Sequence, residues 1–257
     1  MTLILILLLS VPVFADDTAR DVRLIAVSGE VTVYQAGATE GTAASADLPL
    51  DDGDRVVTGP GSAAELGLDD GSVVSLDERT DFTLRSEKRS DTVLEILTGG
   101  LVAKIKKLTA VEGLRIKSPT AVASVRGTEL GVEVVEKGET HVGVFDEGRV
   151  EVSGDAGEKQ TLSPNQETRV IRGGSPARPA ALKRFLKRRA FVRGRLRQRT
   201  GWLAQHWKKL SPDKRKELRQ KLLERREQRE ERSRERRERQ RGRGGREGRP
   251  GPRNNMP

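Results

Sequence analysis

An alternating pattern of β-branched and polar residues, running from about residue 21 to residue 171, most constrains the fold of this chain. Its clearest stretch is VEVVEKGETHVGVFDEGRVEV at residues 132–152, which comes shortly after SPTAVASVRGTEL at residues 118–130. Successive side chains of a strand point to opposite faces of a sheet, so a period of two predicts strands with one buried face. No helical period of useful length occurs in this region. The pattern predicts an all-β domain built to bind and not to catalyse.

The predicted strands are short and are separated by glycine turns. They cover residues 23–27, 30–35, 55–58, 63–68, 72–76, 81–85, 92–97, 101–106, 114–117, 121–125, 129–135, 140–145, 149–152, 160–162 and 168–171. The predicted turns include Asp52-Gly53, Asp70-Gly71, Gly99-Gly100, Lys137-Gly138 and Glu147-Gly148. Three glycine-led fragments recur in form, at residues 29–33, 100–105 and 148–152. This recurrence, with few aromatic residues, favours a solenoid-like stack of short strands, although a sandwich of hairpins would also produce it.

The formal net charge of +10 conceals two halves of opposite sign. Up to residue 172 there are 18 Lys and Arg against 29 Asp and Glu, and from residue 173 onward there are 30 against 9. An acidic domain is therefore joined to a strongly basic tail. This asymmetry indicates either an anionic partner for the tail or self-association through charge.

The N-terminal sequence MTLILILLLSVPVFADD has the form of a secretory signal peptide. Its apolar run of about 14 residues ends at Ala15 and is too short to span a bilayer, which predicts cleavage after Ala15 and a location outside the cytoplasm, periplasmic or secreted. No Lys or Arg precedes the run, so the start of translation is expected upstream. The chain has no cysteine, which excludes disulfides, cysteine metal sites and a lipoprotein anchor.

The composition changes abruptly after the domain predicted for residues 21–172. A linker is expected at residues 173–181, basic amphipathic and charged helices at 182–240, and a disordered tail rich in Arg and Gly at 241–257. Ser211-Pro212-Asp213 has the form of a helix start, with an N-cap residue followed by proline. Pairs such as Glu230/Arg234 and Glu235/Arg239 support helix at the spacing i, i+4.

The residues that catalysis or metal binding would need are sparse. His141 falls inside an alternating strand, and His206 falls in the amphipathic part of the tail. The sequences LDDGD at 50–54 and LDDGS at 68–72 resemble calcium loops only superficially, because they lack the twelve-residue spacing and the closing glutamate, so turn formation is the better interpretation. The expectation is a protein that is not an enzyme and has no cofactor and no metal.

Four blocks follow one another between residues 50 and 152. They are LDDGDRVVTGPGSAAELGLDDGSVVSLDERTDFTL, LEILTGGLVAKIKK, SPTAVASVRGTELGVEV and THVGVFDEGRVEV. Together they resemble the FecR domain family, the extracytoplasmic domain of iron-uptake signalling regulators. The resemblance implies a solenoid-like all-β domain that binds envelope proteins and, in signalling members, relays a signal from an outer-membrane receptor to a sigma factor. Those members carry an anti-sigma segment and a membrane span before the domain. Only a short leader precedes it here, which implies a freestanding, exported version.

Arg126-Gly127-Thr128 is the sharpest signature within this resemblance. The structural interpretation makes Gly127 a backbone position closed to other residues, Thr128 the start of a strand, and Arg126 the partner of a domain carboxylate. The functional interpretation makes Arg126 and Thr128 candidate contacts to a protein partner.

The leading functional hypothesis is an extracytoplasmic binding or scaffold protein that engages an envelope protein. Its tail would attach to an anionic lipid or glycan surface, with candidate contacts at Trp202, Trp207, Lys208 and Lys209. The alternatives are a component of iron-uptake-type signalling through sigma-factor regulation, and nucleic-acid binding by the Arg-rich tail. Export would exclude the nucleic-acid alternative. A solvated charged helix without any ligand is the simplest alternative for the tail.

Overall fold

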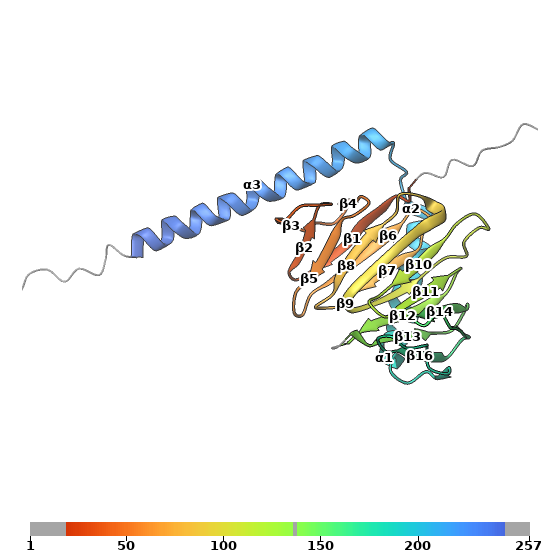
Figure 1. Ribbon diagram of the computed structural model, residues 1–257. Coiled ribbons are helices and arrows are strands. Elements are labelled where there is room, and N and C mark those ends of the chain that lie inside the picture. The colour runs from red at the N-terminus through yellow and green to blue at the C-terminus, as the bar shows by residue number, and fades with distance from the viewer. Residues whose placement is uncertain (1–18, 136–137, 245–257) are drawn as a thin grey trace, which may run out of the picture.

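The protein is mostly β-sheet, followed by helices at its C-terminal end (Figure 1). The computed structural model describes residues 19–135 and 138–244. The predicted signal peptide at 1–15 and most of the predicted disordered tail at 241–257 lie outside these residues. Within the described part, no helix is both long enough and apolar enough to cross a membrane.

The strands form two sheets, called sheet A and sheet B, which share one long strand. Sheet A runs in the order β4 (Pro49–Leu50), β1 (Val22–Ser28), β6 (Ala63–Leu68), β7 (Val73–Leu76), β9 (Thr92–Lys104), β12 (Glu129–Val134), β13 (Thr140–Val144), β16 (Gln166–Val170) and β17 (Ala180–Ala181). Sheet B runs in the order β3 (Gly41–Ala43), β2 (Val31–Tyr34), β5 (Arg55–Thr58), β8 (Asp81–Arg85), β9, β10 (Leu114–Lys117), β11 (Ala121–Val125), β14 (Val150–Gly154) and β15 (Lys159–Leu162). These pairings are antiparallel except for the parallel pair β9 and β10.

The shared strand β9 corrects the turn predicted at Gly99-Gly100. Its first half, up to Thr98, pairs with β8 and β10 in sheet B, and its second half, from Gly99, pairs with β7 and β12 in sheet A. Gly99 has a φ of +85°, which bends the strand without ending it. The glycine therefore passes the chain from one sheet to the other.

The main hydrophobic core consists of the inward-facing residues of both sheets and is almost wholly aliphatic. Phe82 is its one aromatic member among the described residues. Consecutive hairpins alternate between the two sheets, as β10 and β11, β12 and β13, and β14 and β15 show. The solenoid-like stack stays a prediction, because two facing sheets explain the same strand pairing.

The alternating pattern located most strands accurately. The strands predicted at 55–58, 63–68, 81–85, 114–117 and 121–125 match β5, β6, β8, β10 and β11 residue for residue. The prediction missed β3, β4 and β17, which have only two or three residues each and show no alternation. Such short strands form because a neighbouring strand offers them hydrogen bonds, and one sequence segment cannot show that.

The C-terminal helices lie outside the two sheets. A continuous helical stretch consists of α1 (Leu186–Phe191), the π-helical η3 (Val192–Leu196) and α2 (Arg197–His206). After it comes α3 (Pro212–Gly244), while the 3-10 turn η1 (Arg89–Asp91) lies within the β region. The predicted helix start is confirmed, since α3 begins at Pro212 and the Lys214 N–H donates to Ser211 Oγ over 3.4 Å.

Candidate functional site

The outer face of sheet A holds a segment of the basic tail, here called the docked segment (residues 182–207). The Phe185 ring of this segment is fully buried. It lies over two glycines, Gly131 on β12 and Gly143 on β13. A Cβ atom at Gly131 would lie 2.7 Å from Phe185 Cδ1, and one at Gly143 would lie 2.6 Å from Phe185 Cδ2. Neither glycine has a positive φ. These positions therefore need glycine for space, because any side chain would fill the recess that Phe185 occupies.

A second small core extends this contact along the docked segment. Gly67 on β6 lies under Leu203, whose Cδ2 would be 2.8 Å from a Cβ atom placed on the glycine. The buried members of this core are Val73, Val102, Phe145, Leu182, Phe185, Val192, Leu196 and Leu203. The apolar face predicted for the basic tail is thus packed against the protein's own β-sheet.

The cations of the docked segment pair with acids of the domain. The segment carries nine Lys and Arg and no Asp or Glu. Seven of the nine are arginines that form ion pairs, at Arg184, Arg188, Arg189, Arg193, Arg195, Arg197 and Arg199. Their partners are the carboxylates of Glu65, Asp77, Glu129, Glu133 and Asp146. The charge split seen in the sequence is therefore satisfied within one molecule over this segment.

Glu129 and Glu133 show how tightly these pairs are made. Glu129 is buried on β12, and Arg197 donates to both of its oxygens, with Nη2 2.7 Å from Oε2. Burial alone would raise the pKa of Glu129, but the hydrogen bonds from Arg197 and the attraction of Lys104 hold it below its ordinary value. The pKa of Glu133 is lowered in the same way, against its burial, by the hydrogen bond from Arg184 and the charge of Arg188.

Asp146 lies two residues after the end of β13 and is shared by three arginines. Arg189, Arg193 and Arg197 all contact its carboxylate, which is 16% exposed. The hydrogen bond from Arg193, opposed by burial and reinforced by Arg189, lowers the pKa of Asp146 from 3.8 to about 2. The carboxylate therefore stays ionised under all but strongly acidic conditions.

Acidification is expected to release the docked segment. The folded-state pKa values of Glu129, Glu133 and Asp146 lie below their ordinary values, so the stability they contribute is present above pH 4.5 and is lost as the pH falls through the lowered pKa values, of which that of Asp146 is about 2. Asp77 acts in the opposite direction, because burial raises its pKa despite the charge of Arg188.

Tryptophan fluorescence measures this release, since both tryptophans of the chain are in the docked segment. We expect the emission to shift to the red between pH 4.5 and about 2, while circular dichroism still shows strands. The substitution Asp146→Asn serves as the control and should make the acid transition shallower. An emission spectrum that stays constant until the sheets unfold would contradict the prediction.

The residues predicted to contact an anionic surface do not share one face. Trp202 is 52% exposed and stacks on His206, with 4.8 Å between the ring centroids. Trp207 instead packs against sheet A, and the guanidinium of Arg23 lies 4.5 Å from its ring centroid. Lys208 and Lys209 are exposed. Trp207 is therefore not available to an external surface, because its ring packs at the end of the second core.

The structure separates the roles within Arg126-Gly127-Thr128. Gly127 has a φ of +118°, and a Cβ atom there would lie 2.7 Å from Lys107 Cα, so the structural interpretation of this glycine is confirmed. Thr128 is buried and its Oγ1 donates to the carbonyl oxygen of Arg149 over 3.1 Å, which leaves it no surface for a partner. Arg126 is exposed and forms no ion pair with the described residues, so its expected carboxylate partner within the domain is not found there.

The acids of the two calcium-like sequences serve the protein's own groups. Asp54 accepts the N–H of Asp51 over 2.9 Å, and Asp70 accepts the N–H of Ser72 over 2.7 Å, as turns require. His141 lies on β13, as predicted, with Nε2 2.8 Å from a carboxylate oxygen of Glu139.

The first turns of α3 are anchored at the edge of both sheets. Arg219 donates to both oxygens of Asp54, with Nη2 2.9 Å from Oδ1, and to the carbonyl oxygen of Pro49 over 2.6 Å. Both ends of this pair are buried. Leu223, one turn further, joins the main hydrophobic core. A buried ion pair and an apolar contact together set the direction in which α3 leaves the domain.

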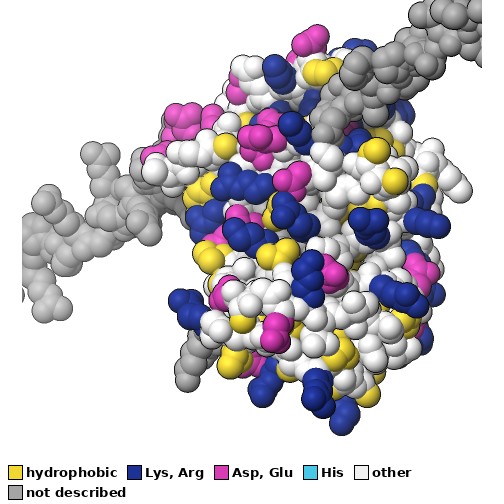
Figure 2. All heavy atoms as spheres, turned by 45° about the vertical axis from the view of Figure 1, so that its right-hand side comes forward, with side chains coloured by type: hydrophobic (Ala, Val, Ile, Leu, Met, Phe, Trp, Pro, Cys, Tyr) yellow, Lys and Arg dark blue, Asp and Glu magenta, His cyan; other side chains and the backbone are white. Residues whose placement is uncertain are grey.

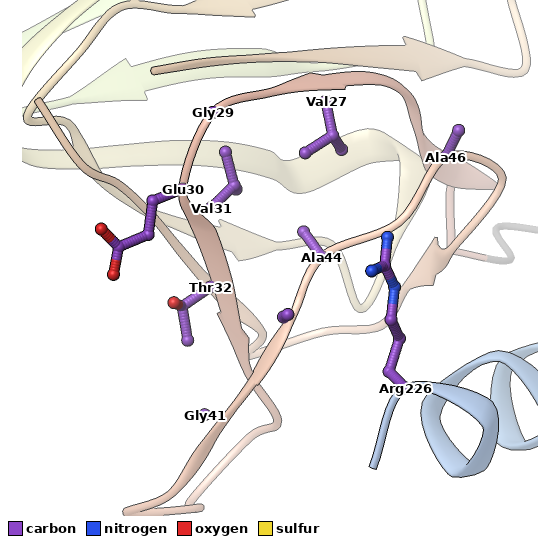
Figure 3. A pocket seen from close by; sticks show the side chains of 10 residues that line it. Val27, Gly29, Glu30, Val31, Thr32, Gly41, Ala44, Ala46 and Arg226 are labelled. Atoms are coloured by element: carbon purple, nitrogen blue, oxygen red, sulfur yellow. The ribbon is translucent and has the colours of Figure 1, made fainter. Parts of the chain in front are cut away.

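A hollow of about 470 Å³ lies beside this anchor, between the loop after β1 and α3. Figure 3 shows Arg226 reaching from α3 toward the segment that carries Ala44 and Ala46. Across the wider surface, Figure 2 shows basic side chains standing among acidic ones on the face that it presents. The hollow carries no cluster of catalytic groups among its lining residues.

Sequence reasoning missed the docking of residues 182–207 but held two signals of it. One was a stretch with nine cations and no acid joined to an acidic domain. The other was the pair of glycines, Gly131 and Gly143, inside strands where they weaken strand formation. Neither signal says which carboxylates or which face of the sheet would receive the tail.

The family model described as FecR protein matches residues 54–151, so the chain contains a FecR domain. This domain spans β5 to β14, at the centre of both sheets. It includes Glu65, Asp77, Glu129, Glu133 and Asp146, the carboxylates that receive the docked segment. No curated protein sequence matches the chain significantly.

Two crystal structures of a candidate anti-sigma factor from Parabacteroides distasonis, at 1.65 Å and 2.50 Å resolution, are similar to the chain. Each is 22% identical to it, with a TM-score of 0.46. The similarity covers 55% of this chain and 65% or 64% of the solved chain. The chain thus spans less than two thirds of those structures.

Proposed function

We propose that this protein, with its FecR domain at residues 54–151, is a non-enzymatic extracytoplasmic binding protein with a signalling or regulatory role. The FecR match is the observation that carries the proposal. The domain would engage an envelope protein, and the tail would hold the complex at an anionic surface. The predicted signal peptide at residues 1–15 supports an extracytoplasmic location.

The exposed Arg126 is the best candidate for contact with the protein partner. It stands on the loop before β12, within the FecR domain, and its guanidinium has no ion-pair partner among the described residues. A free guanidinium can bind a carboxylate with two parallel hydrogen bonds. The neighbouring Thr128 is buried and donates to the carbonyl oxygen of Arg149, so Arg126 is the exposed member of the two.

Anionic-surface attachment, in this proposal, belongs to the part of the tail beyond the docked segment. Seven arginines of the docked segment already pair with domain carboxylates. Their attraction to a lipid or glycan surface would first have to break these pairs. The exposed cations of α3 would not have to break such pairs first.

Iron-uptake-type signalling, through control of a sigma factor, is the alternative that the FecR match also favours. The two functions differ in the partner. A signalling protein would bind an outer-membrane receptor or a sigma-factor regulator, and a scaffold would bind structural envelope proteins.

The proposal is tested by locating the protein and its partner together. We expect a mature N-terminus at Asp16 by mass spectrometry of the protein recovered from the cell envelope. A photo-crosslinking residue at position 126 should then join it to an envelope protein. The same residue at position 159, an exposed site on β15, should not. A soluble cytosolic protein that retains Met1 would overturn the proposal.

A further inference from the structure

The part of α3 that extends past the domain, residues 224–244, is here called the α3 arm. Figure 1 shows α3 running over the β2, β3 and β4 end of the sheets and continuing beyond it. Arg219 and Leu223 hold the helix at the domain edge, and Arg226 is partly covered beside the hollow. These three residues lie on one side of the helix, so its other sides face outward.

Two stripes of opposite charge run along those outward sides. An arginine stripe has the spacing four, three, four and consists of Arg225, Arg229, Arg232 and Arg236, all exposed. An acidic stripe consists of Glu224, Glu227, Glu231 and Glu235, also all exposed. With about 100° of rotation per residue, the centres of the two stripes lie roughly 125° apart around the helix axis. The α3 arm therefore has an arginine face and a separate acidic face.

Within each of the two stripes, neighbouring charges have the same sign. Like charges stand at the spacing i, i+4 in Arg225/Arg229 and Arg232/Arg236, and again in Glu227/Glu231 and Glu231/Glu235. Such pairs destabilise a helix, and the opposite charges at the same spacing in Glu230/Arg234 and Glu235/Arg239 offset only part of that cost. The arrangement is explained if the arginine face meets a negative surface.

The composition of the α3 arm narrows the kind of surface. Residues 224–244 contain no apolar and no aromatic side chain. A coiled coil needs an apolar seam, so a second copy of the helix has nothing to pack against. Single-stranded nucleic acid is held by base stacking on aromatic rings, which the arm also lacks. A layer of charged headgroups requires only cations along a line.

We propose that the arginine face of the α3 arm lies lengthwise on an anionic lipid headgroup layer. The four arginines span twelve residues, with about 16 Å of helix between the first and the last, so they contact the layer together. The acidic face then points away from the lipid, and the anchor at Arg219 and Leu223 holds the β domain beside the contact. The inference rests on the proposed surface attachment and adds which face makes it.

A face-swap variant of the full-length protein tests this without changing composition or net charge. It carries Arg229→Glu, Glu231→Arg, Arg232→Glu and Glu235→Arg. The matched control changes the same four positions but keeps each charge on its face, as Arg229→Lys, Glu231→Asp, Arg232→Lys and Glu235→Asp. Circular dichroism checks that both variants keep their helix.

Binding is measured to phosphatidylcholine vesicles with and without phosphatidylglycerol. We expect the natural protein and the control to bind the phosphatidylglycerol vesicles, more weakly as salt rises, and to leave the neutral vesicles unbound. The face-swap variant loses two arginines from the arginine face. It should bind these vesicles about thirtyfold more weakly, because each cation beside an anionic surface contributes roughly a factor of five to the affinity.

Three other results would overturn the inference, and they differ in what else they affect. Equal binding by the natural protein and the face-swap variant would show that net charge suffices, which leaves the proposed surface attachment standing. No binding by any of the three proteins would remove the attachment as well. Tighter binding to RNA than to phosphatidylglycerol vesicles would assign the arginine face to a different class of partner.

Discussion

Replacing Phe185 by alanine is expected to lower the free energy of unfolding of the full-length protein by about 3–5 kcal/mol. The ring is fully buried and fills the recess above Gly131 and Gly143. The two strands that carry these glycines are held in the sheet by their neighbours, so the recess cannot collapse around the missing ring. The substitution removes the apolar contact that holds the start of the docked segment on sheet A. Urea unfolding, followed by tryptophan fluorescence, measures the loss.

The neighbouring residue Leu186 provides the matched control. It is also a large apolar side chain in the docked segment, but it is 52% exposed, so Leu186→Ala should change the stability by no more than about 0.5 kcal/mol. The substitution Gly143→Ala approaches the same contact from the sheet and should cost about 1–3 kcal/mol through overpacking. Equal effects of Phe185→Ala and Leu186→Ala would show that the docked segment does not contribute its buried face to stability.

Replacing Arg219 by alanine is expected to cost about 3–5 kcal/mol, because it leaves a buried carboxylate without its cation. The side chain of Asp54 is only 1% exposed and that of Arg219 only 10%. The carboxylate keeps the N–H groups of Asp51 and Ala36 as donors, but these do not neutralise its charge. Thermal and urea unfolding of the full-length protein both measure the effect.

Two further variants separate the ion pair from the helix itself. Arg225→Ala removes an exposed arginine from the same helix and should be nearly neutral. The double variant Asp54→Asn with Arg219→Met should recover part of the loss, since it leaves no unpaired buried charge. A double variant as unstable as Arg219→Ala alone would mean that the packing of the side chain, and not its charge, accounts for the cost.

The contacts of Phe185 and Arg219 with the domain divide the basic tail into two parts with different roles. Its first part, the docked segment, is bound to sheet A by Phe185 and by arginines such as Arg197. Its second part, the α3 arm, leaves the domain at Leu223 with its charges exposed. Binding of the whole tail to an external surface would require the arginines of its first part to leave the domain acids that already neutralise them.

The sequence alone determined the elements whose cause is local. Strands such as β5 and β11 follow from the period of two, because one face of each is buried and the other is not. The start of α3 at Pro212 follows from the cap residue Ser211 and from the fixed φ of proline. The positive φ of Gly127 was expected from the residue type, and the FecR match at residues 54–151 falls within the region that the four sequence blocks delimit.

Only the tertiary structure decided where the two halves of the chain meet. The period of two does not reveal that β9 belongs to both sheets, because buried positions alternate only in its first half, while residues 100–103 are all buried. An amphipathic helix with nine cations could equally face a membrane, a polymer or an acidic protein surface. The docked segment packs on sheet A because Gly131 and Gly143 leave room there for Phe185. Carboxylates that are distant in sequence, such as Glu129 and Asp146, also converge around this recess and pair with the arginines of the segment. Convergence of distant residues is a property of the fold, which no local pattern contains.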